Sequence, residues 1–169
     1  SRLKLLNETA HEEILIEEII NGIFEKQNAN VRLKNISLKF IDERKQKQKI
    51  SGDHVLLDMA FSNLISNAIK YVGKNGLVYV TVSEESDKIV LMICDNGVGI
   101  PEEEQKKIFR DFYRASNVKQ KGYEGTGLGL SVVKQIIERH GGAISVESPS
   151  HLGTKEKPGA CFSITLPAG

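Results

Sequence analysis

The stretch that decides the fold is Ile-Val-Leu-Met-Ile-Cys-Asp-Asn-Gly-Val-Gly-Ile, residues 89–100. Its first six residues form an apolar run that predicts a buried strand. Asp95 closes this strand, and its carboxylate can accept a hydrogen bond from a ligand. Gly97 and Gly99 lack a Cβ atom, so the backbone can approach that ligand closely, and Pro101 favours the start of a new helix. Aspartate, asparagine and glycine are also common turn residues, so the stretch alone predicts either a binding corner or an ordinary loop.

The length and composition of the chain are typical of a single globular domain. With 169 residues, 40% of them hydrophobic and 27% charged, the chain is long enough to bury a core. A net charge of +1 argues against a general nucleic-acid binder and against a membrane-surface binder. No apolar run approaches the length of a membrane span, and no signal peptide is visible. Because the chain begins at Ser1 and not at a methionine, we expect a piece of a longer protein.

The two cysteines, Cys94 and Cys161, lie in apolar runs that predict strands. Their spacing does not match a zinc site, and no pattern typical of a catalytic cysteine is present. Cysteines in such runs are usually buried thiols. We therefore expect both to be reduced and the protein to work in a reducing compartment.

The first third of the chain contains one amphipathic segment and two strand-like runs. Residues 1–7 carry little pattern and are expected to be a linker remnant. Apolar residues recur at helical spacing from Thr9 to about Gln27 and predict a helix. Alternation at residues 36–40 predicts a half-buried strand, and residues 50–51 predict a short one. The basic residues 44–49 between these strands are expected to form a solvated loop.

The segment after Asp53 predicts the clearest helix of the chain. Asp53 is a good N-cap, and apolar side chains form one broad face as far as Val72. Asn63, Asn67 and Lys70 share a narrow stripe beside that face. Because an unpaired buried amide costs about 1–3 kcal/mol, the asparagines either cap neighbouring loops or face a ligand cavity. In a cavity, an asparagine oxygen can ligate Mg²⁺ and the lysine can contact phosphate.

Strands and a short helix are predicted around the opening stretch. Residues 77–82 and 89–94 predict two strands, and the polar segment 84–88 between them indicates a hairpin. Pro101 and the three glutamates that follow it predict the first turn of a short helix. The last two strands are predicted at residues 143–146 and 161–166.

An aromatic cluster and a glycine-rich loop follow the short helix. Phe109 and Phe112 either pack in the core or present an apolar anchor to a partner. Residues 116–124 are polar and are expected to form a mobile loop. Gly-Thr-Gly-Leu-Gly-Leu at 125–130 then opens a predicted helix over 130–140 and matches neither a Walker loop nor the dinucleotide fingerprint. Glycines that open a helix expose backbone N–H groups to an anion, so this segment predicts an anion site.

Four of these motifs occur in a fixed order. They are Asn-Leu-Ile-Ser-Asn-Ala-Ile-Lys-Tyr at 63–71, Asp-Asn-Gly-Val-Gly at 95–99, Phe-Arg-Asp-Phe at 109–112 and Gly-Thr-Gly-Leu-Gly-Leu at 125–130. In this order they strongly resemble the catalytic, ATP-binding domain of sensor histidine kinases. That family belongs to a superfamily with gyrase, heat-shock chaperone and mismatch-repair ATPases. The resemblance extends from about residue 8 to the end of the chain.

The resemblance implies a fold of the α/β (α+β) class. It is a two-layer sandwich of the Bergerat type, in which a mixed, mostly antiparallel sheet packs on about three helices. ATP would lie between the helices under a flexible lid. Residues 8–169 would form this domain, after the linker remnant at residues 1–7.

The resemblance also implies a role for each matching residue. Asp95 would bind the adenine amino group, and Asn67 would ligate the Mg²⁺ that bridges the phosphates. Asn63, Lys70 and Arg114 are the expected catalytic residues. The other implied nucleotide contacts are Tyr71 on the ribose and phosphate side, Gly97, Gly99 and Ile100 beside the adenine, and Gly125, Thr126, Gly127, Leu128 and Gly129 in the lid hinge and phosphate cradle.

The function implied by the resemblance is transfer of the γ-phosphoryl group of Mg-ATP to a histidine on a separate dimerisation domain of the same protein. The group would then pass to an aspartate of a response regulator. Relatives that hydrolyse ATP carry a glutamate where Asn63 stands, and an amide cannot act as that general base. Phe109 and Phe112 resemble the box particular to histidine kinases, which would contact the helical domain that carries the acceptor histidine.

The acceptor itself is missing from this chain. The family's acceptor box is His-Glu-Leu-Arg-x-Pro. His11 and Glu12 match only the first two residues of this box. The chain is therefore expected to bind ATP and to phosphorylate histidine only when the acceptor helices are supplied. The resemblance implies a homodimeric parent and a cytoplasmic location, whether or not the parent is membrane-anchored, without direct membrane or nucleic-acid contact by this chain.

Two other functions stay open, a protein serine kinase of the anti-sigma type and a degenerate nucleotide-binding interaction module. One segment also departs from the family pattern. Residues 153–160 are longer than the usual glycine-rich turn before the last strand, so no nucleotide contact is assigned to Thr154.

Overall fold

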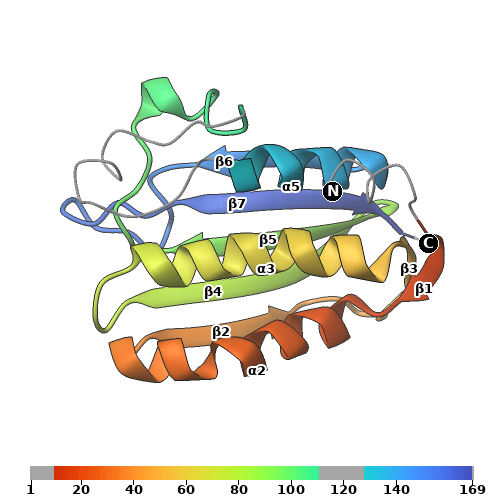
Figure 1. The fold of residues 1–169 in the computed structure, drawn as a ribbon, viewed down its shortest axis with the longest axis horizontal. Helices are drawn as coiled ribbons and strands as arrows, with labels where there is room; N and C mark the ends of the chain where they lie inside the picture. The colour runs from red at the N-terminus through yellow and green to blue at the C-terminus, as the bar shows by residue number, and fades with distance from the viewer. Residues whose placement is uncertain (1–9, 111–127, 169) are drawn as a thin grey trace.

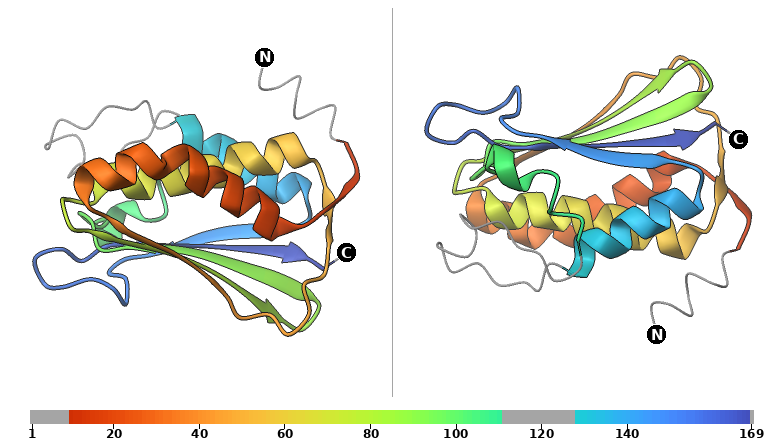
Figure 2. Two further views of the ribbon diagram at one scale, coloured as in Figure 1. Left: turned by 90° about the horizontal axis from the view of Figure 1, so that it is seen from below. Right: turned by 90° about the horizontal axis from the view of Figure 1, so that it is seen from above.

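The protein is a two-layer sandwich of one sheet and one layer of helices. The computed structural model describes residues 10–110 and 128–168. In this part of the chain, three α-helices lie on one face of a five-stranded sheet with strand order β2-β4-β5-β7-β6 (Figures 1 and 2). The predicted fold class is confirmed. The elements are β1 (Glu12–Ile14), α2 (Ile16–Lys34), β2 (Ser37–Asp42), β3 (Ile50–Gly52), α3 (His54–Tyr71), β4 (Leu77–Glu85), β5 (Lys88–Asp95), the short 3-10 helix η1 (Glu102–Glu104), α5 (Leu128–Arg139), β6 (Ala143–Glu147) and β7 (Cys161–Pro167).

The centre of the sheet is the predicted hairpin of β4 and β5. The two strands pair antiparallel from Val78 opposite Asp95 to Glu85 opposite Lys88. Alternate residues of both strands are buried against the helices, which is the pattern expected when one face of a sheet covers the core. β7 pairs antiparallel with β5 on its other side, while β2 pairs parallel with β4. Asp95 therefore stands at the end of a strand that has neighbours on both sides.

Helix α3 crosses the middle of the helical layer and begins where the sequence predicted. The carboxylate of Asp53 accepts a hydrogen bond from the backbone N–H of Leu56, 3.0 Å away, and caps the helix. Its apolar face is buried throughout, with Phe61 and Ile65 fully enclosed. At the other end, the Nζ atom of Lys34 donates to three carbonyl groups that the helix leaves open. These carbonyls belong to Ile69, Lys70 and Val72.

The predicted first helix is wrong at both ends. Residues 12–14 form strand β1, which pairs antiparallel with β3 so that Glu13 lies opposite Ser51. The helix then runs to Lys34, beyond the predicted end at Gln27. It stops because Asn35 adopts a left-handed conformation with φ of 52°, which asparagine tolerates better than most residues. None of the described helices is long and apolar enough to cross a membrane.

The predicted solvated loop is correct for residues 45–49 and wrong for Arg44, which is buried. Its Nε and Nη2 atoms donate to the Asp42 carboxylate at 2.9 and 2.8 Å. Nη2 also lies 3.2 Å from a carboxylate oxygen of Glu17 on α2. Arg44 thus joins the edge strand to the helix above it, and its hydrogen bonds lower the pKa of Asp42.

The predicted reduced thiols are also wrong. Cys94 on β5 and Cys161 on β7 lie opposite each other in the sheet register and form a disulfide, with Cα atoms 4.1 Å apart. Both residues are buried, as the sequence predicted. The pairing follows from the strand register and not from their separation of 67 residues along the chain.

Candidate functional site

The carboxylate of Asp95 is buried at the end of β5 and faces backbone donors. The N–H groups of Gly97 and Ala160 donate to its Oδ1 atom at 2.8 and 3.3 Å. Burial raises the pKa of Asp95 to about 6, because the charged form loses water, while the two N–H donors act in the opposite direction. In the described part of the chain no cationic side chain forms a salt bridge with Asp95. The group is therefore an ionised acceptor at neutral pH, and no cationic side chain within residues 10–110 and 128–168 forms an ion pair with it.

The glycines after Asp95 sit against protein backbone. A Cβ atom on Gly97 would lie 2.7 Å from the carbonyl oxygen of Tyr71, so the corner packs directly on the end of α3. Gly99 has φ of +73°, a conformation that other residues rarely adopt, and a Cβ there would lie 2.6 Å from Pro158. The corner thus needs glycine for close packing within the domain, whatever further room these residues leave for a ligand.

A segment that the sequence did not connect with the site holds Asp95 from the other side. The hydroxyl of Ser150 donates to the Asp95 carbonyl oxygen at 2.6 Å, and the backbone N–H of Asp95 donates to Ala160 at 2.9 Å. Ser148 accepts a hydrogen bond from the N–H of Ile100, 3.0 Å away, and donates to Gly159 at 2.6 Å. Three of these four hydrogen bonds join residues more than 45 positions apart, so no local pattern predicts them. The only signal was the unusual length of the segment before the last strand.

The asparagines of α3 form the second part of the site. The side-chain Nδ2 of Asn67 donates to Oδ1 of Asn63 at 3.1 Å, one helical turn away. A Cβ atom on Gly129 would lie 2.5 Å from Nδ2 of Asn63, so the first turn of α5 packs on this amide. A cavity of about 310 Å³ opens between α2, α3 and α5, and Ser66 lines it together with Asn63 and Gly129. The structure therefore brings together two motifs that lie more than 60 residues apart.

The end of α3 connects the two parts. Lys70 and Tyr71 are both half-buried, and the Lys70 ammonium lies 5.5 Å from the centre of the Tyr71 ring. Because the Tyr71 backbone touches Gly97, the helix that carries the asparagines also supports the Asp95 corner. Asn63, Asn67 and Lys70 thus lie on a helix whose end contacts the corner formed by Asp95 and Gly97.

The other predicted site residues divide into two groups. Phe109 is half-buried: its ring packs edge to face on Phe162 with ring centres 6.2 Å apart, and part of the residue stays exposed. Leu128 is the first residue of α5. The remaining ones lie outside the described residues: Phe112, Arg114, Gly125, Thr126 and Gly127.

This arrangement has a defined chemical capability. A buried carboxylate that is ionised at neutral pH accepts a hydrogen bond from a neutral amino group and discriminates against a ligand that lacks one, because its desolvated oxygen would otherwise stay unpaired. Amide oxygens on the neighbouring helix suit a hard cation, and a glycine-opened helix suits an anion. A purine nucleotide combines these features.

Comparisons with known proteins identify the family. Residues 52–169 match the family model described as histidine kinase-, DNA gyrase B- and HSP90-like ATPase. The circadian input-output histidine kinase CikA of Synechococcus elongatus is 43% identical over 62% of this chain and 13% of its own length. The heme sensor protein HssS of Staphylococcus saprophyticus is 34% identical over 95% of this chain and 36% of its own length. The chain thus spans about a third or less of these two relatives.

Solved structures agree with the family match. The catalytic domain of the histidine kinase ThkA superposes with a TM-score of 0.79 and 28% identity, covering 94% of this chain and 98% of that domain. The sheet order, the helical layer and the order of the motifs described above are thus found together with a family match over more than half of the chain. The chain belongs to the family of histidine kinase-, DNA gyrase B- and HSP90-like ATPases, as a catalytic domain of the sensor histidine kinase type.

Proposed function

We propose that this domain binds Mg-ATP and transfers the γ-phosphoryl group to a histidine on a separate helical domain of the same protein. The observation that carries the proposal is the Asp95 carboxylate, which is buried, held by backbone N–H groups and supported by the helix that bears Asn63 and Asn67. In the proposal Asp95 accepts a hydrogen bond from the adenine amino group. Tyr71, Gly97, Gly99 and Ile100 surround this base and the ribose.

The residues of α3 fit a magnesium ion. Asn67 uses an amide hydrogen toward Asn63, which leaves its Oδ1 atom as the oxygen that can ligate a cation. Mg²⁺ prefers oxygen ligands and keeps several waters and phosphate oxygens, so one or two amide oxygens are a sufficient protein contribution. When bound, the ion supplies charge neutralisation at the phosphates.

Phosphoryl transfer depends mainly on position and charge. We assign Lys70 and Arg114 to the phosphates, and residues 125–129 to the cradle at the start of α5 and to the lid hinge. Gly129 supports this assignment because it packs on Asn63. Asn63 cannot take a proton from water, so ATP stays intact until a better nucleophile, the imidazole of an acceptor histidine, reaches the γ-phosphorus.

The proposed partners are an acceptor domain of the same protein and a response regulator. The acceptor histidine belongs to a dimerisation domain, and the phosphoryl group passes from it to a response regulator. We propose that Phe109 and Phe112 contact the acceptor domain, that residues 8–169 act as one catalytic unit after a linker at 1–7, and that the parent is a homodimer. Because the domain uses ATP, we place it on the cytoplasmic side of the cell.

The test is incubation of the domain with labelled ATP and a supplied domain of acceptor helices. Label that is stable in base and labile in acid is expected, since phosphohistidine has this property. Labelling of a serine in a partner would favour the anti-sigma type of kinase instead. Absence of any adenine-nucleotide binding would leave only the non-enzymatic interaction module.

Two variants assign the roles within the site. Asn67→Ala is expected to abolish Mg-dependent transfer without unfolding the domain, and Asn28→Ala, an exposed helix amide, is the matched control. Asp95→Asn is expected to weaken ATP binding in calorimetry, with Asp87→Asn in the exposed turn between β4 and β5 as control. Wild-type transfer by the first variant, or wild-type affinity of the second, would contradict the assignment.

A further inference from the structure

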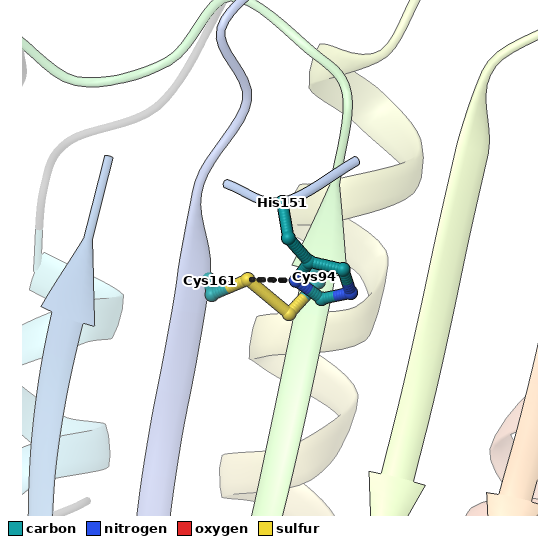
Figure 3. Close-up of side chains that lie close together, drawn as sticks. All are labelled: Cys94, His151 and Cys161. Carbon is teal, nitrogen blue, oxygen red and sulfur yellow. Dashed lines mark hydrogen bonds between the residues drawn. A yellow bond between two sulfur atoms is a disulfide. The ribbon is translucent and has the colours of Figure 1, made fainter. Parts of the chain in front are cut away.

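The disulfide lies directly beside the Asp95 corner. It joins the residue before Asp95 on β5 to the residue after Ala160 on β7 (Figure 3). We propose that Cys94 and Cys161 form a redox-active pair, which a low-molecular-weight thiol or a dithiol protein opens, and that its state sets the affinity of the nucleotide site. The inference rests on the proposed function only in taking Asp95 as the residue that binds the base.

The disulfide lies outside the main hydrophobic core. Ile93 and Phe162, the neighbours of the two cysteines in sequence, pack in that core or against it, and Cys94 and Cys161 do not. Because successive side chains of a strand point to opposite faces, the disulfide lies on the face away from the helices. Opening it therefore leaves the packing between sheet and helices unchanged, and the fold can survive in both redox states.

A histidine stands at the disulfide. Nδ1 of His151 lies 3.8 Å from Sγ of Cys161. His151 is an exposed residue in the segment between β6 and β7. Figure 3 shows the imidazole beside the sulfur–sulfur bond. An imidazole at this position can exchange a proton with the sulfur that leaves when the bond is broken. Because the hydrogen-bond contact of His151 is with Cys161, we take Cys161 as the leaving sulfur and Cys94 as the one attacked.

The reaction balances with a thiol as reductant. The thiolate of a first thiol attacks Sγ of Cys94, the bond between the cysteines breaks, and its electron pair remains on Cys161, which takes a proton by way of His151. A second thiol then attacks the mixed disulfide and releases Cys94 as a thiol. Two thiols are oxidised to one disulfide, and the cysteine pair gains two electrons and two protons.

The same residues that flank the disulfide hold Asp95. The Ala160 N–H donates to its carboxylate, and the Asp95 N–H donates back to Ala160. Ser150, the neighbour of His151, donates to the Asp95 carbonyl oxygen. The closed disulfide keeps β7 beside β5 at this point and therefore keeps the carboxylate oriented. With the bond open, these contacts are free to lengthen, and the base loses a fixed acceptor.

The experiment compares nucleotide affinity in the two states. The domain is equilibrated with oxidised or reduced glutathione, its free thiols are counted, and Mg-ATP binding is measured by calorimetry. Reduction is expected to expose two thiols and to weaken binding about three- to tenfold, the effect of losing one well-placed hydrogen bond. Equal affinities in states that differ by two thiols would overturn the inference. Absence of binding in both states would instead count against the proposed function.

Variants separate the disulfide from the histidine. The double variant Cys94→Ser/Cys161→Ser is expected to bind like the reduced protein and to ignore glutathione, and retained redox sensitivity would contradict the inference. The wild-type comparison decides the question if the double variant does not fold. His151→Gln is expected to slow the appearance of thiols severalfold without changing the final affinity of either state, with His11→Gln at an exposed distant position as control. An unchanged rate would remove His151 from the mechanism.

Discussion

Arg44 and Asp95 are buried to the same degree, 7% and 8% exposed, but they have different partners. Arg44 lies beyond the end of β2 and contacts the carboxylates of Asp42 and Glu17. Asp95 lies toward the opposite end of β4, and its carboxylate accepts hydrogen bonds from backbone N–H groups alone in the part of the chain that the structure describes. A buried charge is costly unless it is paired. Among the described residues, Arg44 is thus a buried charge with ionic partners and Asp95 is a buried charge without one, which agrees with its proposed role as a ligand acceptor.

The largest effect is expected on stability, from Arg44→Ala. The change leaves two carboxylates facing each other in a mostly buried position, which should cost about 2–4 kcal/mol of unfolding free energy. Urea denaturation followed by circular dichroism measures it. Lys45→Ala, one residue on and exposed, should change stability by less than about 0.5 kcal/mol. Equal stability of both variants would show that the pairing of Arg44 is not structural.

Asp95→Asn is expected to raise the free energy of unfolding at neutral pH, whereas Arg44→Ala lowers it. The pKa of Asp95 is raised from 3.8 to about 6, so the folded state holds a proton that the unfolded state has lost between these values. Stability therefore falls as the pH rises from 4 to 6, and the full penalty is present above pH 6. The amide keeps an acceptor for Gly97 and Ala160 without the charge.

The increase in unfolding free energy from Asp95→Asn should reach about 2–3 kcal/mol at pH 7.5 and vanish below about pH 4. Denaturation curves of both proteins across this range measure it. A less stable variant at pH 7.5 would mean that Asp95 has an ionic partner, which would place it with Arg44 in the comparison.

The same titration should appear in nucleotide binding. The adenine amino group needs an ionised acceptor, so affinity is expected to be constant above the pKa of about 6 and to fall up to tenfold per pH unit below it. Calorimetry from pH 5 to 8 measures this change. The Asp95→Asn protein is the control, because any pH dependence of its affinity comes from titration of the nucleotide or of other groups. Parallel curves of affinity against pH for the two proteins would exclude Asp95 as the acceptor.

Asp53 is a third buried charge, and its substitution is expected to change stability less than that of Arg44 or Asp95. It is also buried, and burial by itself raises its pKa, but backbone N–H groups of Ala10, Leu56 and Val55 outweigh this and lower the pKa overall. Asp53→Ala should cost about 1–2 kcal/mol through the lost cap, and Asp53→Asn less, because the amide oxygen still accepts. Thermal unfolding separates the two variants. Identical losses would indicate that the charge, and not the cap, is the source of stability.

Local signals predicted the elements that carry the site. Helix α3 was placed to within a residue or two at each end because Asp53 caps it and its apolar face repeats every turn. The hairpin of β4 and β5 followed from two apolar runs around one polar turn. The positions of Asn63 and Asn67 on one edge of α3 also followed from helical periodicity, and they lie within hydrogen-bonding distance of each other.

What the sequence missed depends on contacts between distant residues. Residues 12–14 have a helical pattern, but pairing with β3 turns them into a strand. The disulfide depends on the register of β5 against β7. The burial of Arg44 depends on the carboxylate of Glu17, which comes from α2. The hydrogen bond from Ser150 to Asp95 spans 55 positions. In each case tertiary structure overrides or adds to a local preference, which a single sequence does not encode visibly.

The parallel pairing of β2 with β4 has a consequence for handling the protein. The family match begins at residue 52, after β2 and α2. A chain cut at that point would leave β4, nine residues long and apolar on one face, with an unpaired row of N–H and C=O groups. Such an edge is a template for joining another chain strand to strand. Strand β2 therefore protects this edge of the sheet against aggregation, separately from any part that it takes in nucleotide chemistry.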